Sequence, residues 1–177
     1  IADLLEELNQ KTFLWVELGL QTIYNKTGEF IRRGYNLEQF DKSVEILKNK
    51  NIKTVVHLIM GLPGESTLQM LNSVKYISNL NIWGVKIHML HIIKNTDLAK
   101  YYEKNPYEIL SLEEYVELIC DCLELLNKDI IIHRLTGDGK KSDLIEPKWT
   151  LHKLKVLSDI DKTLKIRESF QGKNLPL

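Results

Sequence analysis

The stretch that decides the fold is Thr54-Val-Val-His-Leu-Ile-Met-Gly-Leu-Pro-Gly-Glu-Ser66, in which an apolar run ends in a glycine–proline turn. Residues 54–60 are mostly apolar and rich in β-branched side chains, which predicts a strand covered on both faces. The proline favours an extended residue before it, and the glycine after it can adopt a positive φ. Ser66 and Gln69 fit a capping box, so a helix is expected to begin at Thr67. The stretch is typical of a strand–turn–helix unit in a parallel sheet.

Length and composition are those of an ordinary globular domain. The chain has 177 residues, 44% of them hydrophobic and 27% charged, with 24 basic and 24 acidic side chains and a formal net charge of zero. These values exclude a disordered or collagen-like chain and argue against a broad surface for nucleic acid. The two cysteines, Cys120 and Cys122, are too few for a secreted disulfide scaffold, which favours the cytoplasm. Because no apolar run is long enough to span a bilayer, we expect no membrane association.

Strand and helix patterns alternate along the chain. Four apolar runs are predicted as strands: Phe13–Leu20, Thr54–Met60, Gly84–Leu90 and Ile130–Leu135. Amphipathic patterns predict helices between and after them: 25–33, 37–50, 67–80, 98–104, 112–126 and 147–169. The chain also begins inside a helical pattern. The alternation predicts an α/β fold with a parallel sheet of about four strands, half the number in an eight-stranded barrel. It is either a small open sheet or part of something larger.

Polar residues gather toward the carboxyl ends of the predicted strands. Side chains alternate between the faces of a strand, so Glu17 and Gln21 share one face of the first, with Gly19 between them. The other strands contribute His57, then Lys86 and His88, then either His133 or Arg134. Ligands bind at the carboxyl ends of the strands in parallel α/β folds, which favours a functional site. The alternative is structural: Lys86 simply pairs with Glu17, and the histidines are hydrogen-bonded core residues.

Three other patterns do not indicate a metal or nucleotide site. Residues two apart on a helix diverge, so Cys120 and Cys122 cannot share a metal ion. His88 and His91 would point to opposite faces of a strand. The stretch Gly137–Ser142 departs from the phosphate-loop pattern at its first glycine and its last position, so it is interpreted as a flexible basic loop. We therefore predict no metal ligands in this chain.

The same motifs resemble the radical S-adenosylmethionine (SAM) enzymes. The nearest types are the oxygen-independent coproporphyrinogen oxidase and the catalytic subunit of Elongator. The resemblance to their fourth, fifth and sixth strands is carried by Glu17–Thr22 with Arg32-Arg33-Gly34, by His57–Glu65, and by Val85–His88 through Lys94–Leu98. Three further stretches resemble the YhcC-like group of predicted iron–sulfur oxidoreductases: Ile132–Asp138, Pro147-Lys-Trp149 and Gln171-Gly-Lys173. The resemblance spans nearly the whole chain and implies a partial (β/α) barrel.

By this resemblance, six residues lie around bound SAM: Glu17, Gln21, Arg33, His57, Leu90 and His91. Gln21 and Arg33 match positions that contact its ribose and carboxylate. His57 stands where relatives often carry an aspartate, and an imidazole can still make one hydrogen bond there. The backbone near Leu90 and His91 matches the region that meets the adenine.

The resemblance also implies what this chain lacks. Radical SAM enzymes hold a [4Fe–4S] cluster with a C-x-x-x-C-x-x-C motif, which does not occur in this sequence. We therefore expect residues 1–177 to be the carboxyl-terminal part of the domain, with a terminal helical extension at about 147–177. The intact protein would cleave SAM reductively at its cluster and form a 5′-deoxyadenosyl radical. The chain alone is expected to bind no cluster and to be inactive.

The resemblance leaves the substrate unknown, although Elongator-like relatives act on tRNA. Four residues are candidate substrate contacts: Lys86, His88, His133 and Arg134. Two other functions stay open, namely an aldolase-like barrel enzyme with Lys86 as its Schiff-base amine, and a non-catalytic α/β binding module. The predicted strand 13–20 would form an exposed sheet edge, so we also expect either a homodimer through it or a segment that covers it.

Overall fold

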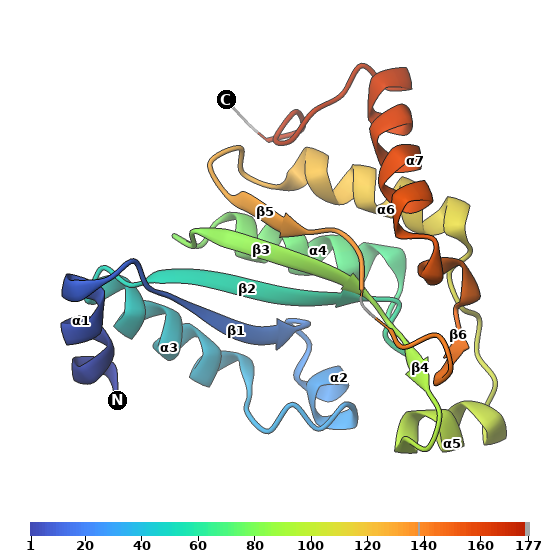
Figure 1. Ribbon diagram of the computed structural model, residues 1–177, viewed down its shortest axis with the longest axis horizontal. Helices are drawn as coiled ribbons and strands as arrows, with labels where there is room; N and C mark the ends of the chain where they lie inside the picture. The colour runs from blue at the N-terminus through green and yellow to red at the C-terminus, as the bar shows by residue number, and fades with distance from the viewer. Residues whose placement is uncertain (138, 176–177) are drawn as a thin grey trace.

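A computed structural model describes residues 1–137 and 139–175 and shows a four-stranded parallel sheet with helices packed against it (Figure 1). The strands β1 (Trp15–Gln21), β2 (Lys53–Met60), β3 (Gly84–Met89) and β5 (Ile131–Arg134) lie side by side in chain order. Every neighbouring pair is parallel. The predicted α/β class and the four predicted strands are confirmed.

The helices connect these strands and continue beyond the last one. They are α1 (Ala2–Lys11), α2 (Asn25–Phe30), α3 (Leu37–Asn49), α4 (Thr67–Ser78), α5 (Asp97–Lys104), α6 (Leu112–Leu125), a 3₁₀ helix (Lys148–Leu151) and α7 (Lys153–Ile166). Capping boxes begin α3 at Asn36, α4 at Ser66 and α6 at Ser111, the last two as predicted. Among the described residues, no helix is long and apolar enough to cross a membrane.

The deciding stretch folds as its residues predict. Gly64 has a φ of +81°, which a residue with a side chain rarely adopts. The Ser66 hydroxyl accepts from the Gln69 N–H at 3.3 Å, and the Gln69 side chain accepts from the Ser66 N–H at 2.9 Å. Glu65 accepts a hydrogen bond of 2.5 Å from the Thr22 hydroxyl, and burial raises the pKa of this carboxyl group. The turn after β2 is thereby tied to the end of β1.

The core lies between the sheet and its helices. Alternate residues of the two central strands, including Leu58 and Ile87, are fully buried and pack in one cluster with residues of α3, α4 and α6. Tyr115 of α6 is completely buried in this cluster and donates from its hydroxyl to the Leu135 carbonyl at 3.0 Å. The helices therefore cover one face of the sheet, and the polar residues of the strands lie on the other.

Three details differ from the sequence prediction. A small antiparallel pair, β4 (Ile92–Ile93) and β6 (Leu144–Glu146), was not predicted because strands of two and three residues carry no periodicity. The predicted helix 147–169 is in fact a 3₁₀ turn followed by α7, and the predicted helix 25–33 already ends at Phe30. Asp138, part of one resembling stretch, lies outside the described residues.

The segment after α7 is fastened to α6. Arg167 forms ion pairs with three carboxylates of α6: Glu117, Asp121 at 2.7 Å and Glu124 at 3.3 Å. The Gln171 amide donates to the carbonyls of Asn127 and Ile130 at 2.7 and 2.8 Å. The conformation of this segment therefore depends on α6 and on the start of β5.

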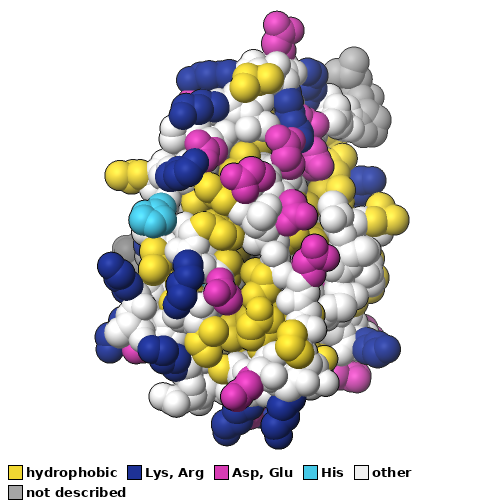
Figure 2. Space-filling view, turned by 90° about the vertical axis from the view of Figure 1, so that its right-hand side faces the viewer, with side chains coloured by type: hydrophobic (Ala, Val, Ile, Leu, Met, Phe, Trp, Pro, Cys, Tyr) yellow, Lys and Arg dark blue, Asp and Glu magenta, His cyan; other side chains and the backbone are white. Residues whose placement is uncertain are grey.

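The side of the molecule that carries α5, β6 and α7 has a mixed surface. Figure 2 shows hydrophobic side chains in the middle of this face, with lysine and arginine along one flank and acidic side chains among them. Both signs of charge therefore occur on it, in keeping with the formal net charge of zero.

Candidate functional site

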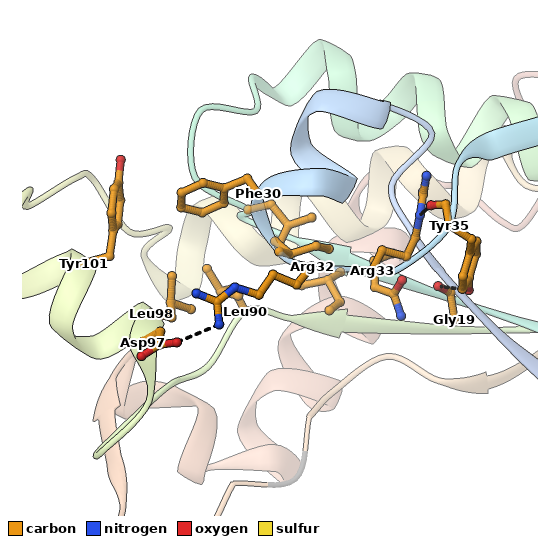
Figure 3. A pocket seen from close by; sticks show the side chains of 13 residues that line it. Gly19, Phe30, Arg32, Arg33, Tyr35, Leu90, Asp97, Leu98 and Tyr101 are labelled. Carbon is orange, nitrogen blue, oxygen red and sulfur yellow. Dashed lines mark hydrogen bonds and ion pairs between the residues drawn. The ribbon is translucent and has the colours of Figure 1, made fainter.

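A pocket of about 830 Å³ lies at the carboxyl ends of β1 and β2. Its walls come from these two strands, from the turn after α2 and from α5 (Figure 3). The apolar part of the lining includes Ile59, Leu62, Leu90 and Leu98. Its size and largely apolar walls suit a small molecule or a cofactor.

Gln21 presents a hydrogen-bond acceptor without a partner in this pocket. The register between β1 and β2 shifts between Leu18 and Gln21, and Gln21 has a φ of +59°. Its amide occupies space that Gly19 leaves, because a Cβ at Gly19 would lie 2.3 Å from the amide nitrogen. The Gln21 Oε1 atom is buried and has no hydrogen-bond partner among the described residues. A ligand hydroxyl or N–H group would satisfy it.

Arg33 also lines the pocket, but its guanidinium is largely used by the chain itself. It donates to the carbonyls of Tyr35 at 2.7 Å, Leu20 at 3.1 Å and Thr22 at 2.6 Å, and to the Asn25 side chain at 3.0 Å. Burial lowers the pKa of the Arg33 guanidinium. Four of the five N–H groups of an arginine are thus engaged. The guanidinium clamps the end of β1 and leaves one N–H for a ligand.

The neighbouring Arg32 points the other way. Its guanidinium pairs with Asp97 of α5 at 2.7 Å, and the Phe30 ring meets the Tyr101 ring edge-on, with centroids 5.0 Å apart (Figure 3). None of these four residues was predicted from the sequence as a site residue. Asp97 lies within a stretch that carries the family resemblance, which was the one signal available for it.

A second polar group lies on the open face of the sheet and centres on Glu17. The Lys86 ammonium donates to both carboxylate oxygens at 2.6 Å, the His57 Nε2 lies 2.7 Å from one of them, and the Trp15 indole donates at 3.2 Å. The hydrogen bond from Lys86 is the main reason why the pKa of Glu17 is lowered to about 2, against the opposing effect of burial. The strand alternation correctly placed Glu17, His57 and Lys86 together, and their pairing agrees with the structural alternative.

The remaining candidate substrate contacts adjoin this group. The His88 ring lies 5.4 Å from the His57 ring, and burial, with the nearby charges of His57 and Arg134, lowers the pKa of His88 to about 4. His133 packs edge-on against Trp83 at 4.9 Å, and burial lowers its pKa as well. The Nε2 atoms of His88 and His133 are buried without a partner among the described residues. The lowered pKa favours the neutral form of both histidines.

Three of the six predicted SAM contacts line the pocket: Gln21, Arg33 and Leu90. Glu17 and His57 lie on the open face instead. His91 packs beneath the loop after β5, since a Cβ at Gly137 would lie 2.6 Å from its ring. The strand β3 ends at Met89, so the chain has already turned away at His91.

The cysteines lie outside both groups of residues. Cys120 and Cys122 are completely buried in α6, and burial raises the pKa of both thiols. The Cys120 sulfur lies 3.8 Å from the Ile160 carbonyl of α7. Among residues 1–137 and 139–175, no group of three or more histidine, cysteine, aspartate or glutamate side chains is arranged to hold a metal ion. The described residues therefore do not fit an iron–sulfur cluster.

We predict that acid weakens the fold through Glu17. A carboxyl group with a lowered pKa stabilises the folded state above its ordinary pKa of 4.5, and this contribution is lost as the pH falls toward 2. The expected loss is about 1 kcal/mol, because the Glu17 side chain is 34% exposed and solvent screens the pair. Urea unfolding from about pH 7 to pH 3 should show a larger loss for the wild type than for Glu17→Gln. Equal losses in the two proteins would contradict the prediction.

Comparison with known proteins identifies the family. Residues 1–77 match the radical SAM superfamily, and residues 82–166 match the radical SAM C-terminal domain. The chain is 42% identical over 173 residues to the uncharacterized protein YtqA of Bacillus subtilis, covering 98% of this chain and 54% of YtqA. It is 28% identical to protein YhcC of Escherichia coli, over 93% of this chain and 53% of YhcC. The chain thus spans about half the length of these relatives.

Two further proteins match this chain over a smaller share of their own length. A tRNA uridine(34) acetyltransferase of Methanocaldococcus jannaschii is 31% identical over 75% of this chain and 26% of its own length. The solved structure of archaeal Methanocaldococcus infernus Elp3 with an N-terminal deletion superposes with a TM-score of 0.79 at 23% identity, over 94% of this chain and 39% of that one. This likeness shows a shared fold, and the two family matches confirm the resemblance that the strand motifs indicated. The chain belongs to the radical SAM superfamily, in its YhcC-like group.

Proposed function

We propose that this chain supplies the SAM-binding pocket of a radical SAM enzyme. The observation that carries the proposal is the buried, unpartnered Oε1 of Gln21 in a pocket of about 830 Å³ at the carboxyl ends of the strands. SAM offers ribose hydroxyls to such an acceptor and a flat adenine to apolar walls such as Ile59 and Leu90. Arg33 keeps one N–H for the carboxylate. Glu17, His57 and His91 lie outside the walls, and their contacts with SAM stay predictions.

A binding titration tests this proposal. Isothermal titration of the chain with SAM should give saturable binding to one site. Gln10→Ala serves as a control that should bind SAM like the wild type, because Gln10 is exposed on α1 and does not line the pocket. Failure to saturate at about 1 mM SAM, equivalent to a binding free energy weaker than about −4 kcal/mol, would contradict the proposal.

For the whole protein, the proposal includes reductive cleavage of SAM at a [4Fe–4S] cluster, with formation of a 5′-deoxyadenosyl radical that abstracts hydrogen from the substrate. The described residues do not fit that cluster, so its thiolate ligands would come from elsewhere in the whole protein. This chain would bind and orient SAM, and the cofactor chemistry would be supplied at the cluster.

We predict that the isolated chain binds no iron and is inactive. The two thiols are buried in α6, and their raised pKa values disfavour the thiolate form that iron requires. Anaerobic treatment with iron and sulfide, followed by desalting and an iron assay, should leave iron well below one equivalent per chain. A stoichiometric [4Fe–4S] absorption spectrum would overturn the prediction.

The open face of the sheet is the proposed substrate side. Lys86, His88, His133 and Arg134 remain the proposed contacts. A tRNA substrate is proposed by analogy with the relative named a tRNA uridine(34) acetyltransferase. A Schiff-base role for Lys86 is not favoured, because its Nζ atom is held by hydrogen bonds of 2.6 Å to both oxygens of Glu17.

We also predict that β1 pairs with a second copy of the chain. β1 hydrogen-bonds to β2 on one side, and its other edge has no strand partner within the described part of the chain. An unprotected edge strand favours pairing with another strand. Light scattering should therefore give the mass of a dimer at micromolar concentration, and the mass of a monomer would contradict it.

A cytoplasmic location and a helical extension from about residue 147 also stay predictions.

A further inference from the structure

The two sides of the pocket touch each other at two places. One side is the end of α2 with the turn after it, which carry Phe30 and Arg32, and the other is α5, which carries Asp97 and Tyr101. The Arg32 guanidinium reaches the Asp97 carboxylate at 2.7 Å, and the rings of Phe30 and Tyr101 meet edge-on at 5.0 Å (Figure 3). All four side chains line the pocket, so these contacts close it on one side.

The side that carries Arg32 is held firmly. The next residue, Arg33, makes four hydrogen bonds to the chain around the end of β1. Its guanidinium also packs on Gly28 of α2, where a Cβ would lie 2.9 Å from its central carbon. Arg32 itself has a φ of +57°, which directs its side chain away from this clamp and toward α5. This wall of the pocket is therefore a fixed support.

The side that carries Asp97 is held loosely. None of the residues of α5 is buried, although the helix packs beside the short strand β4. Thr96 caps its first turn by accepting from the Ala99 N–H at 3.1 Å. Asn95, just before the helix, has a φ of +64°, and the segment 105–111 that follows is irregular. Helices with few buried contacts open at low free energy, and residues with unusual backbone angles at their ends can serve as hinges.

We propose that α5 is a lid over the pocket and that the ion pair between Arg32 and Asp97 is the latch that holds it closed. The identity of the retained ligand rests on the proposed function, whereas the motion of the lid does not. The latch suits reversible closure because the side chains of Arg32 and Asp97 are 78% and 61% exposed. Exposed ion pairs and exposed aromatic pairs are weak and compete with water.

Hydrogen exchange without any ligand tests the lid. Arg32→Ala should speed the exchange of the amides of Tyr101–Lys104 by about threefold to tenfold, with α4 unchanged as an internal reference. Asp97→Asn should act through the same contact, so the double variant should exchange no faster than the faster single variant. Lys100→Ala is the matched control. Lys100 pairs with the same carboxylate at 3.5 Å, but both residues belong to α5, so this pair does not connect the helix to the opposite wall of the pocket. Unchanged exchange in Arg32→Ala, or additive effects in the double variant, would overturn the latch.

The dissociation rate of SAM tests what the lid retains. In stopped-flow displacement, Arg32→Ala should release SAM about threefold to tenfold faster than the wild type, while Lys100→Ala releases it at the wild-type rate. Raising the salt from roughly 0.05 to 0.5 M should speed release from the wild type and leave Arg32→Ala unchanged. Failure of the wild type to bind SAM would contradict the proposed function. The hydrogen-exchange experiment, which uses no ligand, would still show whether α5 acts as a lid. Faster exchange without faster release would overturn retention of SAM by the lid.

Discussion

Replacing Arg33 by alanine is expected to lower the free energy of unfolding by about 2–4 kcal/mol, measured by urea denaturation at neutral pH. Its guanidinium satisfies three backbone carbonyls and the Asn25 side chain around the end of β1. Removing it leaves the half-buried carbonyls of Tyr35 and Thr22 without these donors, and each such loss costs more than an ordinary hydrogen bond contributes. The same variant should lose the fixed wall of the pocket.

Two further variants make the Arg33 prediction specific. Arg32→Ala, at the adjacent position, should change stability by less than about 1 kcal/mol, because it removes one exposed ion pair. Arg33→Lys should recover little of the lost stability, since an ammonium group cannot place donors on four acceptors at once as a planar guanidinium does. If Arg33→Ala were no less stable than Arg32→Ala, the clamp would have no energetic role.

Substitutions at Gly19 and Gln21 are expected to weaken SAM binding about tenfold to a hundredfold, equivalent to about 1.4–2.8 kcal/mol. Gln21→Ala removes the unpartnered acceptor from the pocket. Gly19→Ala retains it but displaces the Gln21 amide, whose nitrogen lies 2.3 Å from the new Cβ. Because the displaced group is the end of a flexible side chain, we expect Gly19→Ala to change stability by less than about 1 kcal/mol.

Titration calorimetry and thermal melts of the same samples separate an effect on SAM affinity from an effect on stability. Loss of affinity with an unchanged melting temperature would support a role of Gln21 in binding. Gly84→Ala is the contrasting variant, since its Cβ would lie 2.5 Å from the His133 ring and 3.0 Å from the Ile131 carbonyl. A backbone neighbour cannot swing away, so this variant should lose about 1–3 kcal/mol of stability. Wild-type SAM affinity in both Gly19→Ala and Gln21→Ala would contradict the assignment of the pocket.

The sequence predicted the parts of the site that depend on strand periodicity. Alternation along β1, β2 and β3 was enough to place Glu17, His57 and Lys86 on one face. Ligands bind at the carboxyl ends of parallel strands, and this rule placed Gln21 at the pocket. That its side-chain acceptor has no partner is seen only in the structure. The placement of Glu17, His57 and Lys86 succeeded because a regular strand fixes the direction of each side chain through its register. At Gln21 the register of β1 is already shifted.

The parts that were missed depend on contacts between distant segments. Arg32 and Asp97 are 65 residues apart, and their pairing depends on where α5 packs. Three of the partners of Arg33 are backbone carbonyls, which every residue has, so no side-chain pattern could indicate them. His91 was assigned to the adenine region by family resemblance. The structure ends β3 at Met89 and places the His91 ring beside Gly137, so its contact with SAM stays a prediction.

The fastening of the last segment to α6 has a consequence for synthesis on the ribosome. The Arg167 guanidinium forms ion pairs with three carboxylates of α6, and the Gln171 amide donates to the carbonyls of Asn127 and Ile130 just before β5. Until residues 167–171 have left the exit tunnel, Glu117, Asp121 and Glu124 repel one another on a nascent helix that lacks its counter-charge. Ribosome-bound chains that stop before Arg167 should therefore be cut by protease within α6 more readily than chains extended through Gln171.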